Sequence, residues 1–338
     1  MEEKIYRTID LFAGIGGIRL GFEKNGFETV FANDLDPYCK VTYDLNFKST
    51  PLLVADIAKV ASKNLPDFDI LLGGFPCQPF SIAGYRRGFL DTGRGDLFFE
   101  IVRIIRDKKP KAVFLENVKN LRSHDDGRTM KIIETALADL GYHVKCKVLN
   151  SMTHGNVPQN RERVYIVAFR NKRHFHAFEF PIEKPLRKSI AQVLDRDAPD
   201  KYYYNDSPLF PVLAAEITKP GTVYQWRRQY VRQNKSGVCP TLTANMGTGG
   251  HNVPLILDHK GIRKLTPREC ARLQGFPESY KIPTTLTDSR LYKQFGNSVT
   301  TTVIAQVAAS VRAALECTDN VFPFIATKGE NRTLRKAA

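Results

Sequence analysis

Short apolar runs alternate with amphipathic segments through the first half of the chain. The apolar runs predict strands at 28–32, 52–55, 69–73, 111–118 and 164–169, and helical periodicity predicts helices at 97–106 and 129–140. Strands that alternate with helices in this way indicate an α/β fold with a doubly wound, mostly parallel sheet over residues 1–180.

The pattern changes after Phe180. Residues 181–210 are rich in Pro, Asp and Tyr and keep no sustained period, which indicates a hinge followed by a separate module. A long, apolar, Ala-rich helical pattern then returns at 299–315. The sequence therefore predicts a large layered unit and a second, less regular one.

Small and acidic residues follow the first three predicted strands. The run at 8–11 leads into a glycine turn at 14–17 and then into a helical pattern, which is the order of elements in a nucleotide-type cofactor cradle. The glycine spacing departs from the dinucleotide fingerprint and favours an adenosyl cofactor. Asp34 and Asp56 follow the next two strands, where an acidic side chain reaches ribose hydroxyls. Each acid alone is more often a turn residue or a helix cap.

A rigid turn after the strand at 69–73 presents one cysteine. Cys77 lies between Pro76 and Gln78, and the neighbouring prolines restrict the backbone that carries the sulfur. We interpret Cys77 as a nucleophile, whereas a lone cysteine near a loop is more often a buried apolar residue. A later strand delivers Glu116 at its carboxyl end, the edge at which ligands of open α/β sheets gather.

Composition narrows the class of protein. The 338 residues carry 50 Lys+Arg against 35 Asp+Glu, a net charge of +15, and the isoelectric point is about 9.5, which suits a polyanionic partner. We expect a cytoplasmic protein, because the N-terminus lacks a signal peptide's apolar core and no apolar run of membrane-spanning length is evident. Six scattered cysteines without C-x-x-C pairs argue against zinc or a disulfide framework.

Together these segments resemble the cytosine-C5 DNA methyltransferases of the bacterial restriction-modification type. The matching elements occur in the family's order: Asp10–Ile18, Gly74–Ser81 with Pro-Cys-Gln, Glu116–Val118, Gln159–Arg163 with Gln-x-Arg-x-Arg, Arg263–Pro277, and Gln294–Val299 with Gly-Asn-Ser-Val. They cover most of the chain and are jointly very specific. Two positions depart from the pattern, since Asp34 stands where Glu is common and Gly93 is an addition, but neither removes a catalytic group.

The resemblance implies a fold and a division of the chain. The expected fold is the sheet of S-adenosylmethionine-dependent methyltransferases, joined to a smaller, irregular target-recognition domain. Residues 1–180 plus 292–338 are expected to form the catalytic and cofactor-binding domain, with the helix at 299–315 returning beside the cofactor. Residues 181–291 are expected to form the target-recognition domain with its hinge.

The resemblance also implies the reaction. S-adenosyl-L-methionine donates a methyl group to C5 of a cytosine that is flipped out of double-stranded DNA, after Cys77 attacks C6. Glu116 hydrogen-bonds the exocyclic amine and holds or delivers a proton at N3. Arg163 and Arg161 bind the base O2 and nearby phosphate, which stabilises charge pushed onto the ring.

Further residues are assigned by the same resemblance. Asn117 and Gln78 are expected to position the reacting groups, and residues 83–96 are expected to form a basic loop that closes over the DNA. The arginines of that loop are Arg86, Arg87 and Arg94. The expected cofactor contacts are Phe12, Gly14, Gly16, Asp34, Leu35, Asp56, Ile57, Pro76, Leu97, Asn297 and Val299.

Target recognition is expected between residues 170 and 260, the part that varies in the family. There the block 224–235 interleaves basic with aromatic residues, and a glycine loop follows at 247–250. Arginine is suited to reading guanine in the major groove. The recognition candidates are Arg227, Arg228, Arg232, Thr241 and Leu242. Phosphate binding explains the same arginines equally well, and the recognised DNA sequence stays open.

Three other functions share parts of this pattern. An NAD-dependent dehydrogenase has the glycine turn but does not need Pro-Cys-Gln together with Glu-Asn-Val. A transfer RNA methyltransferase of the same fold shares the Cys and the Glu, while the basic aromatic block favours duplex DNA. A catalytically silent DNA-binding module is disfavoured because every catalytic position is present. We expect a monomer without metal or membrane, whose functional partner is a restriction endonuclease acting on the same site.

Overall fold

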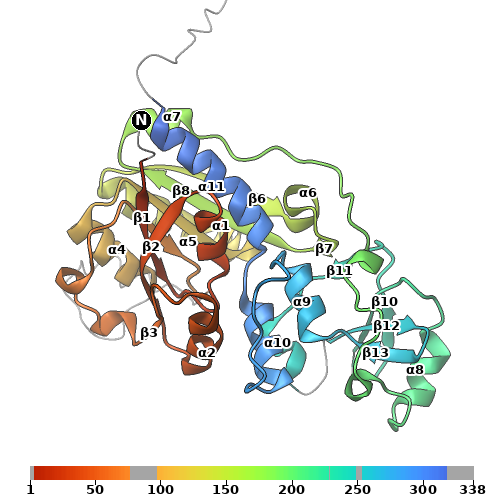
Figure 1. The fold of residues 1–338 in the computed structure, drawn as a ribbon. Helices are drawn as coiled ribbons and strands as arrows, with labels where there is room; N and C mark the ends of the chain where they lie inside the picture. The colour runs from red at the N-terminus through yellow and green to blue at the C-terminus, as the bar shows by residue number, and fades with distance from the viewer. Residues whose placement is uncertain (1–3, 77–96, 228, 249–252, 318–338) are drawn as a thin grey trace, which may run out of the picture.

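A seven-stranded sheet forms the centre of the large unit (Figure 1). The computed structural model describes residues 4–76, 97–227, 229–248 and 253–317. In sheet order the strands are β3 (Leu53–Val54), β2 (Phe27–Asp34), β1 (Tyr6–Leu11), β4 (Ile70–Gly73), β5 (Ala112–Val118), β8 (Glu162–Phe169) and β6 (His143–Asn150). Neighbouring strands are parallel except where β8 pairs antiparallel with β5 and β6. The predicted α/β, mostly parallel sheet is confirmed.

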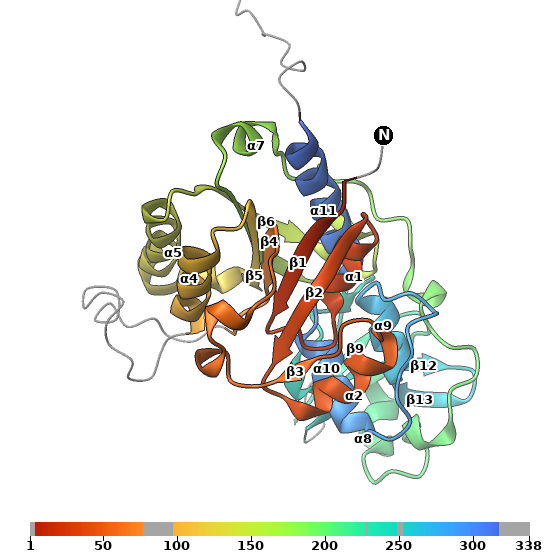
Figure 2. The same ribbon diagram turned by 60° about the vertical axis from the view of Figure 1, so that its left-hand side comes forward.

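Helices cover both faces of this sheet (Figure 2). They are α1 (Gly17–Glu23), α2 (Pro37–Asn46), α4 (Leu97–Lys108), α5 (Arg128–Asp139), α6 (Ser151–Gly155), α7 (Lys172–Ala177) and α11 (Thr301–Glu316). Successive side chains of a strand point to opposite faces, so Leu71 packs with α4 and α5, whereas Ile70 and Leu72 pack with α1 and α11. Burial on both faces explains why β4 is apolar at every one of these positions.

One segment does reach membrane-spanning length, contrary to the expectation from the sequence. Residues Asp288–Glu316 are long and apolar enough to cross a membrane by length and composition alone. They comprise α10 (Asp288–Asn297) and α11, and 56% of the most apolar 18-residue stretch is buried inside the protein. Val303, Val307 and Val311 of α11 lie in the core against the sheet. Packing of a core helix therefore accounts for this apolar stretch.

A smaller group of elements lies beside the large sheet. It contains α8 (Phe210–Glu216), β9 (Tyr224–Trp226), β10 (Val231–Gln233), β12 (Pro254–Asp258), β13 (Gly261–Lys264) and α9 (Pro267–Leu273). Its four strands form an antiparallel sheet in the order β10-β9-β12-β13 over a small core. A short parallel ladder between β7 (Gln159–Asn160) and β11 (Cys239–Pro240) connects this group to the large unit. The expected domain boundaries remain a prediction.

A buried ion pair fixes the junction between β13 and α9. The guanidinium of Arg263, which is fully buried, donates to both carboxylate oxygens of Glu269 at 2.8 and 2.7 Å and to Asp258 Oδ2 at 2.6 Å. Glu269 also accepts the N–H of Thr266 at 2.6 Å and completes the capping box of α9. The motif at 263–277 thus joins a strand to a helix through matched buried charges.

Candidate active site

A cavity of about 770 Å³ lies at the carboxyl ends of β1, β2, β4 and β5. Ligands of open α/β sheets bind at this edge. The cavity is lined by the expected cofactor contacts Phe12, Gly14, Asp34, Leu35, Asp56, Ile57, Pro76, Leu97, Asn297 and Val299, and by Glu116, Asn117, Arg161 and Arg163. The structure therefore brings the residues expected for the cofactor and those expected for catalysis into one space.

The glycine turn and the end of β2 hold each other in place. The N–H of Gly14 donates to Asp34 Oδ2 at 2.8 Å, and the N–H of Asp36 donates to Oδ1 at 2.8 Å. Burial raises the pKa of Asp34, while these N–H groups oppose the shift. Gly16 does not line the cavity. Its φ is 79°, and a Cβ at this position would lie 2.3 Å from the Phe47 ring, so glycine is needed for the turn into α1.

Glu116 and Arg163 form a largely buried pair that lines the same cavity. Glu116 Oε1 lies 3.2 Å from Arg163 Nε, with side chains 9% and 14% exposed. Oε1 accepts no directed hydrogen bond from any residue that the structure describes. Burial raises the pKa of Glu116, and the nearby cations Arg163 and Arg161 oppose the rise. A raised pKa favours the protonated carboxyl group that can donate to a base nitrogen.

Asn117 connects β5 to the turn that precedes the cysteine. Its Nδ2 donates to the carbonyl of Phe75 at 2.9 Å, and its Oδ1 accepts the N–H of Val118 at 2.8 Å. Phe75 and Pro76 come directly before Cys77 in the sequence. The side chain of Asn117 therefore holds the backbone that leads to the expected nucleophile.

Arg161 is almost fully buried and is bound by backbone carbonyls. Its Nη1 donates to Leu242 O at 2.8 Å, and its Nη2 donates to Gly296 O and Ser298 O. Its Nε finds no acceptor within the described ranges. Burial lowers the pKa of this guanidinium. Arg161 therefore joins two chain segments beside the cavity, and its contact with base or phosphate stays a prediction.

The recognition candidates lie in different environments. Arg232 is exposed on β10, and Arg227 lies at the end of β9 with Nη2 3.5 Å from Gln225 Oε1. Thr241 Oγ1 donates to Asn160 O at 2.7 Å. Leu242 is 1% exposed in the hydrophobic core, so its side chain packs inside the protein and presents no surface to DNA. Leu242 bonds to Arg161 and Gln159 through its backbone carbonyl and N–H, and its place in target recognition stays a prediction.

Several expected site residues fall in the parts of the chain that the structure does not describe. These are Cys77, Gln78, Arg86, Arg87, Arg94 and Arg228. Their roles stay predictions from the sequence.

Residues of α10 at the cavity were missed by sequence reasoning. Lys293 Nζ pairs with Asp36 Oδ2 at 2.8 Å, and the guanidinium of Arg290 lies 3.9 Å from the centre of the Tyr38 ring. A signal was available, because 290, 293 and 297 share one face of a helix that ends at the expected cofactor contact Asn297.

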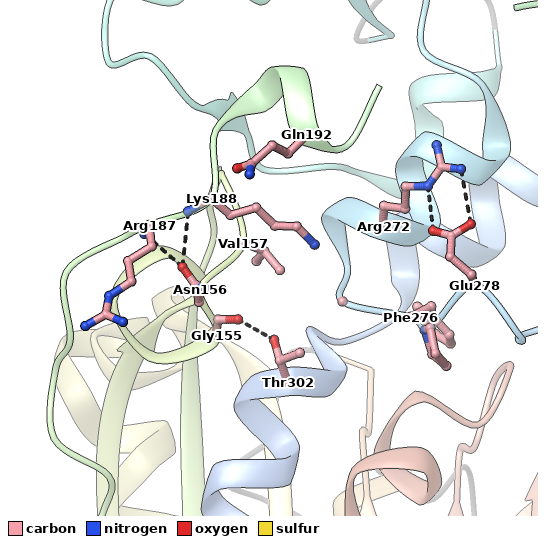
Figure 3. Close-up of a pocket in the computed structure, with 12 residues that line it drawn as sticks. Gly155, Asn156, Val157, Arg187, Lys188, Gln192, Arg272, Phe276, Glu278 and Thr302 are labelled. Carbon is pink, nitrogen blue, oxygen red and sulfur yellow. Dashed lines mark hydrogen bonds and ion pairs between the residues drawn. The ribbon is translucent and has the colours of Figure 1, made fainter. Parts of the chain in front are cut away.

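A second cavity, of about 520 Å³, lies between α6, α9 and the start of α11 (Figure 3). Arg272 is paired there with Glu278, while the side chain of Lys188 extends into the space. Thr302 Oγ1 donates to Gly155 O at 2.7 Å and joins α11 to α6. No expected catalytic, cofactor or recognition residue lines this cavity within the described chain, so the candidate active site is the larger one.

Comparisons with known proteins show the family to which the chain belongs. A sequence profile of the family described as C-5 cytosine-specific DNA methylase matches residues 6–313. The chain is 53% identical over 306 residues to the Type II methyltransferase M.Bsp6I of Bacillus sp. (strain RFL6), covering 89% of this chain and 96% of the relative. It is 42% identical over 325 residues to the Type II methyltransferase M.HhaI of Haemophilus parahaemolyticus, covering 91% and 95%.

A solved structure shows the same fold. The S. pombe Dnmt2 methyltransferase superposes with a TM-score of 0.71 at 22% identity, covering 92% of this chain and 100% of that one. At this identity the likeness concerns the fold alone. The sequence profile and the relatives cover most of the chain, and every family element except Arg263–Pro277 contributes lining residues to one cavity. The chain belongs to the C-5 cytosine-specific DNA methylase family and is a DNA (cytosine-5-)-methyltransferase of the restriction-modification type.

Proposed function

We propose that this enzyme transfers the methyl group of S-adenosyl-L-methionine to C5 of a cytosine flipped out of a short, specific duplex sequence, with Cys77 as covalent nucleophile. One observation carries the proposal. A single cavity holds the glycine turn and acidic strand ends together with the buried pair of Glu116 and Arg163. A cofactor and a target base need such a shared space for group transfer.

The residues of the cavity suit an adenosyl ligand. Asp34 and Asp56 have carboxylate oxygens already oriented by backbone N–H groups, from Gly14 at 2.8 Å and Ala58 at 3.0 Å, and keep lone pairs for ribose hydroxyls. A Cβ added at Gly14 would meet no atom within 4 Å, so this glycine leaves the cavity open to a ligand. When bound, S-adenosyl-L-methionine supplies an electrophilic methyl group.

Cys77 and Glu116 would make C5 of the cytosine nucleophilic. The Cys77 thiolate forms a bond to C6, and the ring electrons move toward N3, which takes the proton of Glu116. C5 then has the electron density to accept a methyl group. Loss of the C5 proton to a base afterwards breaks the C6–sulfur bond and releases the thiolate. Glu116 would then recover its proton from N3, and the proton taken from C5 would pass through that base to solvent water.

Arg163 would stabilise the charge that this addition creates. Its guanidinium lies against Glu116, so it faces the part of the cavity where the acid acts. A fixed cation aimed at developing negative charge lowers the barrier without reorganisation. The raised pKa of Glu116 supports the same assignment, because the acid must carry a proton beside this cation.

DNA would reach the cavity as a flipped base, since C6 and C5 are inaccessible in a stacked duplex. The net charge of +15 supports binding to the phosphate backbone. Arg227 and Arg232 on the β9–β10 hairpin are candidates for contact with the duplex. We further infer a cytoplasmic monomer whose functional partner is an endonuclease of the same specificity.

Bisulfite sequencing of plasmid DNA from cells that express this chain tests the function. The expected result is 5-methylcytosine at one position of one short sequence, and none with a Cys77→Ser variant. Unmodified plasmid DNA together with methylated cellular RNA would overturn the DNA assignment in favour of an RNA substrate. Methylation by Cys77→Ser would instead overturn the covalent mechanism.

A further inference from the structure

Two buried glutamines lie between the segments that surround the reaction. Gln159 and Gln274 are both fully buried, and Gln159 Nε2 donates to Gln274 Oε1 at 3.3 Å. Neither residue lines the cavity of the active site. Buried amides keep a fixed orientation when their donors and acceptors are all engaged, so the contacts of each glutamine define what it holds.

Gln274 holds the turn between α10 and α11. Its Nε2 donates to Phe295 O at 2.8 Å and to Ser298 O at 3.2 Å, and its Oε1 accepts from Thr300 Oγ1 at 3.1 Å. Asn297 and Val299 lie between these contacts and line the cavity. Gln274 therefore sets the backbone of the segment that the proposed function assigns to the cofactor.

Gln159 holds the segment expected to support target recognition. Its Oε1 accepts the N–H of Leu242 at 2.9 Å, and its Nε2 also donates to Leu273 O at 2.7 Å. Gln159 makes no hydrogen bond to residues 295–300, and Gln274 makes none to residues 241–243, within the described chain. The contact between the two amides thus links the two segments through the glutamines, in addition to the link that Arg161 makes between Leu242 O and the carbonyls of Gly296 and Ser298.

We propose that Gln274 is a positioning residue that makes cofactor affinity and discrimination among DNA sequences depend on each other through Gln159. If the Ser298 carbonyl moves, the side-chain amide of Gln274 must rotate to keep its hydrogen bond. The rotation moves the Gln274 oxygen that accepts from Gln159, and a shifted Gln159 moves the N–H of Leu242. Coupling of this kind is reciprocal. The inference rests on the proposed function, because it takes the turn at 297–299 as a cofactor contact.

A double-mutant cycle tests the coupling. The variants are Gln274→Met, Gln159→Met and the double substitution, and the probes are S-adenosylhomocysteine and a duplex containing the methylated site against a single-base variant. We expect each single variant to lose about tenfold in S-adenosylhomocysteine affinity and in discrimination, since buried carbonyl and N–H groups lose their partners. The double variant should be no worse than the worse single one.

The most informative variant is Gln159→Met, because Gln159 makes no hydrogen bond to the cofactor segment whose affinity is measured. Gln159→Met should weaken S-adenosylhomocysteine binding in the wild-type background but not beside Gln274→Met. Unchanged binding by Gln159→Met, or a double variant about a hundredfold weaker as independent effects require, overturns the inference. Wild-type protein that fails to bind S-adenosylhomocysteine would overturn the proposed function itself, which separates the two failures.

A matched control and a milder variant complete the design. Gln306→Met removes a glutamine amide that donates to His154 O between α11 and α6, away from the cavity, and should leave both measurements within about twofold. If Gln274→Met does not fold, Thr300→Val deletes the hydroxyl that donates to Gln274 Oε1. It should lower affinity and discrimination together by a few-fold, and a change in one without the other contradicts the coupling.

Discussion

Arg163 Nε lies 3.2 Å from Glu116 Oε1 where β5 ends beside the start of β8. The cation and the burial act on the pKa of Glu116 in opposite directions, and burial prevails. The carboxyl group therefore carries its proton to higher pH than a surface glutamate while it remains beside a permanent positive charge. One pair can then both deliver a proton and stabilise charge on a bound base.

Replacing Glu116 by Gln should slow methyl transfer by roughly 10²–10⁴-fold, because an amide cannot deliver a proton as an acid does. In the wild type the single-turnover rate should fall as pH rises through the raised pKa, and the variant should lack this dependence. Glu162→Gln, which changes an exposed carboxylate paired with Lys119, is the matched control. Full single-turnover activity of Glu116→Gln would exclude the acid role.

Substituting Cys77 by Ser should abolish methyl transfer while DNA binding stays largely intact, because oxygen is the weaker nucleophile at similar size. In DNA with 5-fluorocytosine at the target, fluorine blocks the final loss of a proton from C5. The wild-type enzyme should therefore stay covalently bound to this DNA, and the adduct should be visible on denaturing gels. Cys317→Ser, at a cysteine far along the chain, is the control and should still form the adduct. An adduct with Cys77→Ser would show that another residue is the nucleophile.

Arg227→Ala and Arg232→Ala separate base reading from phosphate binding. Loss of an arginine that reads a guanine edge should reduce discrimination at one base pair by about 1–3 kcal/mol. Loss of a phosphate contact should weaken binding to all sequences alike and lower the slope of log K against log salt concentration by about one. Competition binding with single-base variants of the methylated site at fixed salt measures the difference. If neither substitution alters discrimination, recognition comes from another part of the region, with the segment around Thr241 next to be tested.

Arg263→Met should destabilise the protein by about 3–5 kcal/mol, because it leaves Glu269 as an unpaired charge that is fully buried. Urea unfolding followed by circular dichroism measures the loss. The double variant Arg263→Met/Glu269→Leu removes both charges and should recover much of the stability. A double variant as unstable as the single one would mean that packing, and not the buried charge, is responsible.

Asp10 should make stability depend on pH. It is fully buried, and burial raises its pKa from 3.8 to about 8 although the charge and the backbone N–H of Arg19 oppose the rise. The folded state thus favours the protonated form of Asp10. The contribution of Asp10 to the free energy of unfolding is therefore complete below pH 3.8 and is lost as pH rises toward 8. Thermal unfolding of Asp10→Asn between pH 5 and 9 should show a flatter curve than wild type, and parallel curves would contradict this assignment.

The strand ends could be predicted from the sequence because each is an apolar run followed by Gly, Asp or Glu. Asp34 and Glu116 accordingly lie in one cavity, as the carboxyl edge of a parallel sheet requires. The roles of Arg161 and Leu242 could not be predicted in this way. Arg161 binds backbone carbonyls of distant segments, and Leu242 takes part through its own backbone N–H and carbonyl. Backbone groups are the same in every residue type, so the sequence does not reveal such contacts. The contact of Gly16 with the Phe47 ring likewise leaves no trace in residue type, and its expected contact with the cofactor stays a prediction.

The reversed direction of β8 makes the active site sensitive to strand alignment. Arg163 stands opposite Val118, and Tyr165 stands opposite Glu116, in an antiparallel ladder whose side chains alternate between faces. A slip of one residue would turn Arg163 to the other side of the sheet and bring a neighbour into its place. A single residue inserted within β8 would therefore separate the guanidinium of Arg163 from the carboxyl group of Glu116, even if every other contact of the sheet were kept.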